Sequence, residues 1–147
     1  GAAYARDTVR NAKAFAQALA AEGFDVLAES RGYTASHQVL TRHGDADSGA
    51  GTKAAQLLED GGIVTNMNML PGDTKALTPS GLRLGVQELT RVGFTPDEMQ
   101  DVARFYARIL IHGEDPSKVR VDVKDLKSQF QTIRYCFNED GRSGYPL

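Results

Sequence analysis

The stretch Leu77-Thr78-Pro79-Ser80-Gly81-Leu82-Arg83-Leu84-Gly85 predicts a short strand that carries one cation between two glycines. Successive side chains of a strand point to opposite faces, so we expect Leu82 and Leu84 to face one way and Arg83 the other. A guanidinium has the planar, two-pronged geometry that grips a carboxylate or a phosphate. The alternative is a structural salt bridge from Arg83 to a neighbouring Asp or Glu, and the pattern leaves it open.

Helical and strand patterns surround this stretch in the order helix, two strands, helix, two strands, helix and one further helix. The expected helices are 7–22, 52–60, 95–113 and one with apolar positions between 119 and 133, and the other expected strands are 24–28, 37–41 and 63–65. This order predicts an α+β fold in which a small sheet of about four strands is covered by helices. Residues 1–113 are expected to form this domain, and 114–147 a helical extension with a loose end at 138–147.

One helix start is well marked in the sequence. Thr95 has the side chain of an N-cap, Pro96 fits the first helical position, and Glu98 can bond back to the cap. The helix from Thr95 is therefore expected to begin at a capping box.

The length, charge and composition of the chain exclude several classes of protein. The chain has 147 residues, enough for one domain, and a net charge of −2, which argues against nucleic-acid or acidic-membrane partners. No apolar run has the length of a membrane span. The single cysteine, Cys136, allows no internal disulfide and favours the cytoplasm. The first residue is Gly1 rather than Met, so we expect the chain to be part of something larger.

Residue spacing indicates no catalytic or metal site. The three histidines and Cys136 are scattered, and no pair has the spacing of metal ligands. A phosphate loop is not indicated, because Gly49-Ala50-Gly51 lacks the Lys-Ser/Thr ending. We therefore expect no metal ligand and no catalytic residue in this chain.

Two amides form the other candidate binding feature. Asn66 and Asn68 alternate, so both can present amides to one side, where an amide can donate and accept at a heterocycle edge. Alternatively they cap the turn at Pro71-Gly72-Asp73.

Several of these segments resemble one known family in order and spacing. The similarity covers roughly residues 4–111 and is to the small C-terminal domain of serine hydroxymethyltransferase, through residues 11–14, 19, 23–26, 63–68, 71–73, 76–85 and 89–94. The Pro-Gly-Asp to Leu-Gly segment is the most specific part. The segment from Glu114 runs past the usual end of the family's domain.

The resemblance implies a fold-type-I pyridoxal-phosphate (PLP) enzyme that moves a one-carbon unit between serine and glycine with tetrahydrofolate. It implies that Arg83 holds the carboxylate of the amino-acid substrate. It also implies a folate or second-substrate contact at Asn68, with Asn66 beside it.

Departures from the family pattern refine these expectations. The cofactor-binding lysine, and the Asp and His that hold the pyridine ring, belong to the family's large domain, so PLP is expected on a large domain or a partner subunit. This chain alone is then not expected to be catalytic. Met67 stands where the family usually has lysine, which speaks against tetrahydrofolate as cosubstrate. Thr34-Ala35-Ser36-His37 is less polar than the family's Thr-Asp-Asn-His.

Three functions follow as hypotheses. The first is a substrate-binding small domain or subunit of a hydroxymethyltransferase-like enzyme that cleaves β-hydroxy amino acids by a retro-aldol reaction. The second is a threonine aldolase or transaldolase of a natural-product pathway that does not use folate. The third is a non-catalytic module that binds an amino acid or docks a partner. For an enzyme piece we expect an apolar patch along the first helix and an oligomer when complete.

Overall fold

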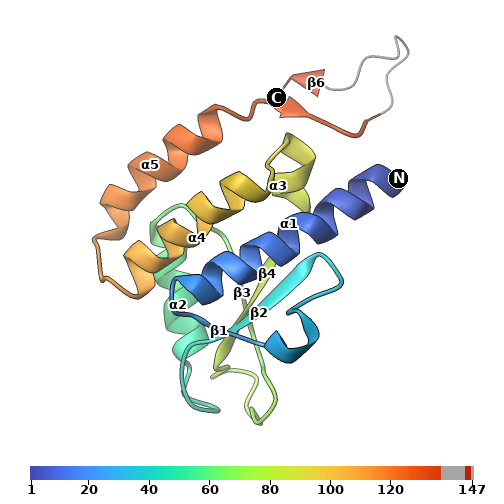
Figure 1. Ribbon diagram of the computed structural model, residues 1–147. Helices are drawn as coiled ribbons and strands as arrows, with labels where there is room; N and C mark the ends of the chain where they lie inside the picture. Colours follow the sequence, from blue (N-terminus) through green and yellow to red (C-terminus); the bar gives the residue numbers. More distant parts are fainter. Residues whose placement is uncertain (137–144, 147) are drawn as a thin grey trace.

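A four-stranded antiparallel sheet lies at the centre of the computed structural model, which describes residues 1–136, 145 and 146 (Figure 1). The strand order is β1-β2-β4-β3. Their bounds are Asp25–Val26 for β1, Gln38–Arg42 for β2, Asn66–Asn68 for β3 and Gly81–Gly85 for β4. The strand that carries Arg83 is therefore internal, with a partner on each side.

Five α-helices accompany the sheet: α1 Ala2–Ala21, α2 Ala50–Asp60, α3 Gln87–Val92, α4 Pro96–Leu110 and α5 Pro116–Ser128. The longest, α1, packs along α4 and also contacts β1 and β2, whereas α2 contacts β3 and β4 (Figure 1). Helices and sheet share one core, whose largest fully buried apolar side chains are Leu19, Leu58, Leu82, Met99, Val39, Val86 and Val119. The α+β architecture expected from the sequence is confirmed.

The strand β4 divides its side chains as the sequence predicts. Leu82 and Leu84 are buried in the core, while Arg83 between them is exposed. The neighbouring strand β2 follows the same alternation, with Val39 and Thr41 buried. The helices therefore cover one face of the sheet, and Arg83 extends from the other.

Two of the expected strands differ in the structure. The strand predicted at 63–65 is wrong, because the N–H of Ile63 bonds to the Leu58 carbonyl at the end of α2 and cannot join a sheet ladder. Pairing with β4 begins instead at Asn66. The strand predicted at 24–28 shortens to Asp25–Val26, since Ala28 has a left-handed backbone that starts a 3-10 turn.

The helices also depart from the expected bounds. The first begins at Ala2 rather than at residue 7, and the short helix α3 was not expected at all. The predicted helix with apolar positions up to 133 ends at Ser128. Phe130 lies beyond it and packs against Phe94, with ring centroids 4.2 Å apart, and the strand β5, Thr132–Ile133, follows.

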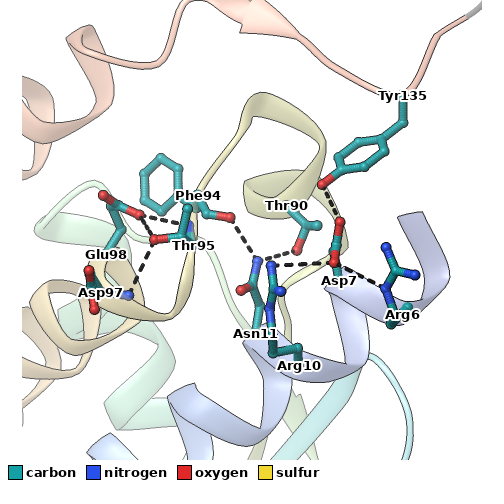
Figure 2. Close-up of polar contacts among 10 residues, drawn as sticks. All are labelled: Arg6, Asp7, Arg10, Asn11, Thr90, Phe94, Thr95, Asp97, Glu98 and Tyr135. Carbon is teal, nitrogen blue, oxygen red and sulfur yellow. Dashed lines mark hydrogen bonds and ion pairs between the residues drawn. The ribbon is translucent and has the colours of Figure 1, made fainter. Parts of the chain in front are cut away.

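The capping box expected at Thr95 is present (Figure 2). The backbone N–H of Thr95 donates to the Glu98 carboxylate at 2.7 Å, and the Thr95 hydroxyl accepts from the Asp97 N–H at 3.4 Å. The cap fixes the start of α4 shortly after α3, whose last residue is Val92 and whose C-cap is Gly93.

Buried Asn11 ties α1 to α3 and to Phe94, which lies between α3 and α4. Its side-chain amide donates to the Thr90 hydroxyl at 3.0 Å and to the Phe94 carbonyl at 2.8 Å (Figure 2). A second link lies about two helical turns earlier in α1, where the Tyr4 hydroxyl donates to the carbonyl of Gln87 at 2.9 Å. These bonds hold α3 in place directly after the strand of Arg83.

The C-terminal extension is packed where the structure describes it. Val119 of α5 is buried in the main core, and the Tyr135 hydroxyl donates to the Asp7 carboxylate at 2.8 Å (Figure 2). Most of the expected loose end, 138–147, lies outside the described residues, and its described part, Tyr145–Pro146, forms β6 and pairs with β5. A domain boundary between 113 and 114 stays a prediction.

The expectation of an apolar patch along the first helix is wrong for the described residues. The apolar side of α1 is used by α4 and the sheet, and none of its large apolar side chains is exposed. The exposed large apolar residues lie elsewhere, at Leu57, Val64, Met67, Met69, Leu77, Ile111, Val121 and Tyr135. Of the helices described, none is both long and apolar enough to cross a membrane.

Candidate functional site

Arg83 lies in the middle of a row that crosses three strands. Its β2 partner is Leu40, and its β3 partner is Asn66. Directly opposed residues of antiparallel strands project to the same face, so Asn66 and Arg83 are side-by-side neighbours there. The sequence predicted both as candidates, and the sheet brings them together.

The guanidinium of Arg83 forms no ion pair and no hydrogen bond with any residue that the structure describes. Other arginines are paired: Arg108, for example, contacts Glu114 at 2.7 Å and Asp122 at 2.6 Å. The structural salt bridge considered from the sequence is thus not observed for Arg83. Its donors are available to a ligand.

A pocket of about 220 Å³ opens beside Arg83. It is lined by His37, Gln38, Val64, Thr65, Asn66, Arg83, Leu84, Gly85, Gln87 and Tyr106. Arg83 is the one formally cationic Lys or Arg side chain of this lining, and no carboxylate belongs to it. Such a pocket suits a small anion.

The pocket does not supply the covalent link that a pyridoxal cofactor needs. Its lining includes no lysine, so no amine is placed to bind the cofactor's aldehyde. The residues present fit the carboxylate end of an amino acid rather than the cofactor ring.

Two glycines leave this face of the strand without side chains on either side of Arg83. Gly81 and Gly85 lie two residues before and after Arg83 and face the same side of the strand. A side chain at Gly81 would collide with Leu70, and one at Gly85 would meet the Gln87 amide. The space on each side of Arg83 is therefore taken by a residue from outside the strand.

Asp73 fixes the loop that leads into β4. Its carboxylate accepts from the N–H of Leu70 at 2.8 Å and from both the N–H and the hydroxyl of Ser80 at 2.9 Å. These donors, the backbone N–H groups first, hold the pKa of the Asp73 carboxyl well below its ordinary value. Ser80 precedes Gly81, so Asp73 sets where the Arg83 strand starts.

Asn68 is placed differently from Asn66. It pairs with Gly81 rather than with Arg83, and its side-chain amide donates to the Met69 carbonyl at 2.6 Å. It does not line the pocket. The side chain of Asn68 thus forms a local hydrogen bond, which resembles the turn-capping role considered from the sequence. Its role as a folate or second-substrate contact stays a prediction.

Met67 lies on the other face of β3. It pairs with Leu82, and its sulfur accepts from the Thr52 hydroxyl of α2 at 3.3 Å. The position where the family usually has lysine therefore faces α2 and not the row of Arg83 and Asn66.

Among the pocket residues that the sequence did not predict, two have unused hydrogen-bonding oxygens. Thr65 and Gln87 line the pocket, and each has a buried side-chain oxygen without a hydrogen-bond partner. Neither belongs to a recognisable motif, and only the three-dimensional placement of α3 and of the segment before β3 identifies them. Within the described ranges, no group of three or more His, Cys, Asp or Glu side chains could hold a metal ion.

Comparison with known proteins fits this geometry. The family model described as serine hydroxymethyltransferase matches residues 2–106, which include all of β4 and the pocket lining. The chain belongs to the serine hydroxymethyltransferase family. Members of this family use PLP, as the resemblance implied.

Among its curated relatives are serine hydroxymethyltransferases of two archaea. That of Thermococcus kodakarensis is 51% identical over 100% of this chain and 34% of the relative. That of Pyrococcus furiosus is 51% identical over 94% of this chain and 33% of the relative. This chain thus spans about a third of the length of these relatives. Because the first alignment includes residues 114–147, the C-terminal extension is shared with that relative.

A solved structure is also similar. The L-threonine transaldolase from Pseudomonas fluorescens has a TM-score of 0.77 and 35% identity, over 86% of this chain and 28% of that chain. That structure holds the transaldolase in its internal aldimine state.

Proposed function

We propose that this chain is the substrate-binding small domain or subunit of a hydroxymethyltransferase-like enzyme that cleaves β-hydroxy amino acids by a retro-aldol reaction. The observation that carries the proposal is the exposed guanidinium of Arg83 at a small pocket, where no described residue pairs with it and no carboxylate of the described residues joins the lining. A guanidinium that lies at such a pocket with all its donors free within the described residues can bind a ligand carboxylate with two bonds.

In this proposal Arg83 binds the carboxylate of the amino acid through two parallel N–H···O bonds. Such a grip fixes the rotation of the substrate about its Cα, so the bond to be cleaved keeps one orientation. Asn66, the cross-strand neighbour of Arg83, supplies an amide on the same side of the sheet. PLP, held by the rest of the protein, supplies the electron sink for the cleavage.

A chimera tests this function. The matching third of the Thermococcus kodakarensis relative is replaced by this chain, and serine and threonine cleavage are measured with Arg83, Arg83→Lys and Arg83→Ala. We expect Arg83→Ala to raise the KM for the amino acid by about 100-fold, the loss of a charged hydrogen-bonded pair. Lysine should recover only part of it, because it lacks the fork. Unchanged KM and kcat in Arg83→Ala would contradict the proposal.

A transaldolase is the second candidate, favoured by the similarity to the L-threonine transaldolase and by Met67 at the usual lysine position. It would use an aldehyde as acceptor in place of folate. Tetrahydrofolate is therefore added to the chimera while glycine binding is measured. Tighter glycine binding favours the folate-dependent transferase, and no effect together with aldehyde-dependent product favours the transaldolase.

A non-catalytic module is the third candidate, since the chain spans only about a third of its relatives. Mixing the chain with the PLP-binding part of the Thermococcus kodakarensis relative distinguishes a non-catalytic module from a piece of an enzyme. A cofactor absorbance band that shifts with glycine only after mixing supports the enzyme piece. A chain that never alters that band, yet binds amino acids, supports the module.

A further inference from the structure

The side chain of Gln87 reaches back over β4, onto the face of the sheet that carries Arg83. A Cβ added at Gly85 would lie 2.5 Å from Oε1 and 3.2 Å from Nε2 of Gln87. Gly85 is two residues from Arg83, so that added Cβ would point to the same face as Arg83. The amide of Gln87 therefore fills the place beside Arg83 that a side chain at Gly85 would occupy. Both residues line the same pocket.

Gln87 and Arg83 have complementary hydrogen-bonding groups that are unused. The Oε1 of Gln87 is buried and accepts no hydrogen bond from the residues that the structure describes, an arrangement that costs free energy when no partner arrives. Arg83 has five N–H donors, and none is used within the described part of the chain. A carboxylate held by two parallel bonds uses two of the five. Donors remain for one further acceptor.

The backbone of Gln87 is fixed, whereas its side chain is not bonded. The Tyr4 hydroxyl donates to the Gln87 carbonyl at 2.9 Å. In the same helix, Thr90 accepts a hydrogen bond from Asn11 (Figure 2). Only the side-chain torsions of Gln87 need to change for its amide oxygen to meet the guanidinium. The long arginine side chain can bridge the spacing between alternate residues of a strand, about 7 Å.

We propose that Gln87 is a positioning residue for Arg83. When a carboxylate occupies the pocket, two N–H groups of Arg83 bind it and another donates to Oε1 of Gln87. The bond orients the plane of the guanidinium toward the ligand and restricts its rotamers, which reduces the entropy lost on binding. The proposal rests on the proposed function of Arg83 as a carboxylate ligand.

The test is acetate binding by this chain, followed in NMR spectra through the Nε–H signal of Arg83. That signal is assigned by its loss in Arg83→Ala. Gln87→Leu removes the acceptor with little change in size. Gly85→Ala leaves the acceptor in the chain but displaces the amide from beside Arg83. Glu88→Ala, an exposed neighbour in the same helix, is the matched control.

We expect Gln87→Leu and Gly85→Ala each to weaken acetate binding about tenfold, and Glu88→Ala to leave it unchanged. Gln87→Glu should weaken it further than leucine, because a carboxylate there neutralises the guanidinium. If Gln87 had only a structural role, acetate affinity would not decrease in the order parent, Gln87→Leu, Gln87→Glu. Thermal unfolding of each variant verifies that the fold is retained.

Two results would overturn the proposal in different ways. In the first, Gln87→Leu and Gly85→Ala both bind acetate as tightly as the parent chain, while Arg83→Ala does not bind it. This result would show that Gln87 does not position Arg83, and it would leave the carboxylate role of Arg83 intact. An Arg83 signal that does not respond to acetate in the parent chain overturns the carboxylate role of Arg83 and, with it, that of Gln87.

Discussion

Asp47 and Asp73 each hold the loop that carries the other. The backbone N–H of Asp47 donates to the carboxylate of Asp73 at 2.7 Å. In return the carboxylate of Asp47 accepts from the N–H groups of Thr74 and Lys75, both at 2.7 Å. Two loops that are 26 residues apart in the chain are thereby joined through side-chain-to-backbone bonds. One of these loops leads directly into β4.

Replacing Asp73 by Asn should lower the unfolding midpoint and reduce its dependence on acid pH. The folded protein keeps this carboxyl ionised because its pKa is held well below the ordinary value of 3.8. Its contribution to stability is present above that value and is lost as the pH falls below it. Denaturant unfolding at pH 3, 4 and 6 measures the effect. Asp45→Asn, an exposed change in the loop that carries Asp47, should behave as the parent.

His43 should make the protein less stable between about pH 6.5 and pH 4. Burial lowers the pKa of its imidazole from 6.5 to about 4, so the unfolded chain takes up a proton in this range before the folded protein does. Stability is full above pH 6.5 and falls as the pH decreases toward 4. Urea midpoints of His43→Gln should lack this slope, while exposed His112→Gln retains it. An identical slope in His43→Gln would contradict the prediction.

Thr95→Ala should cost about 1 kcal/mol of stability, the usual value of an N-cap. The substitution removes the hydroxyl that accepts from Asp97 and that bonds Glu98 at 2.6 Å. Chemical denaturation gives the free energy of unfolding directly. Gln100→Ala, an exposed change in the same helix, is the control and should stay within about 0.5 kcal/mol.

Gly51→Ala should destabilise the protein by roughly 1 to 3 kcal/mol, as overpacked core substitutions do. A methyl group at this position of α2 would collide with the backbone of Gly81, which cannot move without displacing β4. Alanine favours helix formation by up to about 1 kcal/mol over glycine, so a stabilised variant would show that α2 can shift away from the strand. Lys53→Ala, exposed on the same helix, controls for the added helix propensity.

Features fixed by local chemistry were predictable from the sequence. The alternation of Leu82, Arg83 and Leu84 depends only on the period of a strand, and the capping box at Thr95 depends on three neighbouring residues. Asn66 could be named as a candidate because it alternates with Asn68, so that both can present amides to one side. That it would lie opposite Arg83 required the register of the sheet.

Features fixed by distant contacts were not predictable. The apolar run at 63–65 has strand propensity, yet the end of α2 captures Ile63 and shifts pairing to Asn66. The six-residue helix α3 is too short for a clear helical period, so Gln87 carried no signal of its position beside Arg83. The paired bonds of Asp47 and Asp73 join residues that no sequence pattern connects.

The single cation between two leucines also has a consequence for how the sheet assembles. A slip of β4 by one residue would turn both leucines out to water and carry the guanidinium into the apolar interior. Misaligned pairing is thus penalised twice, so Arg83 also disfavours the wrong strand register during folding. Variants that remove its charge for reasons of catalysis should be examined for strand misregistration during refolding as well.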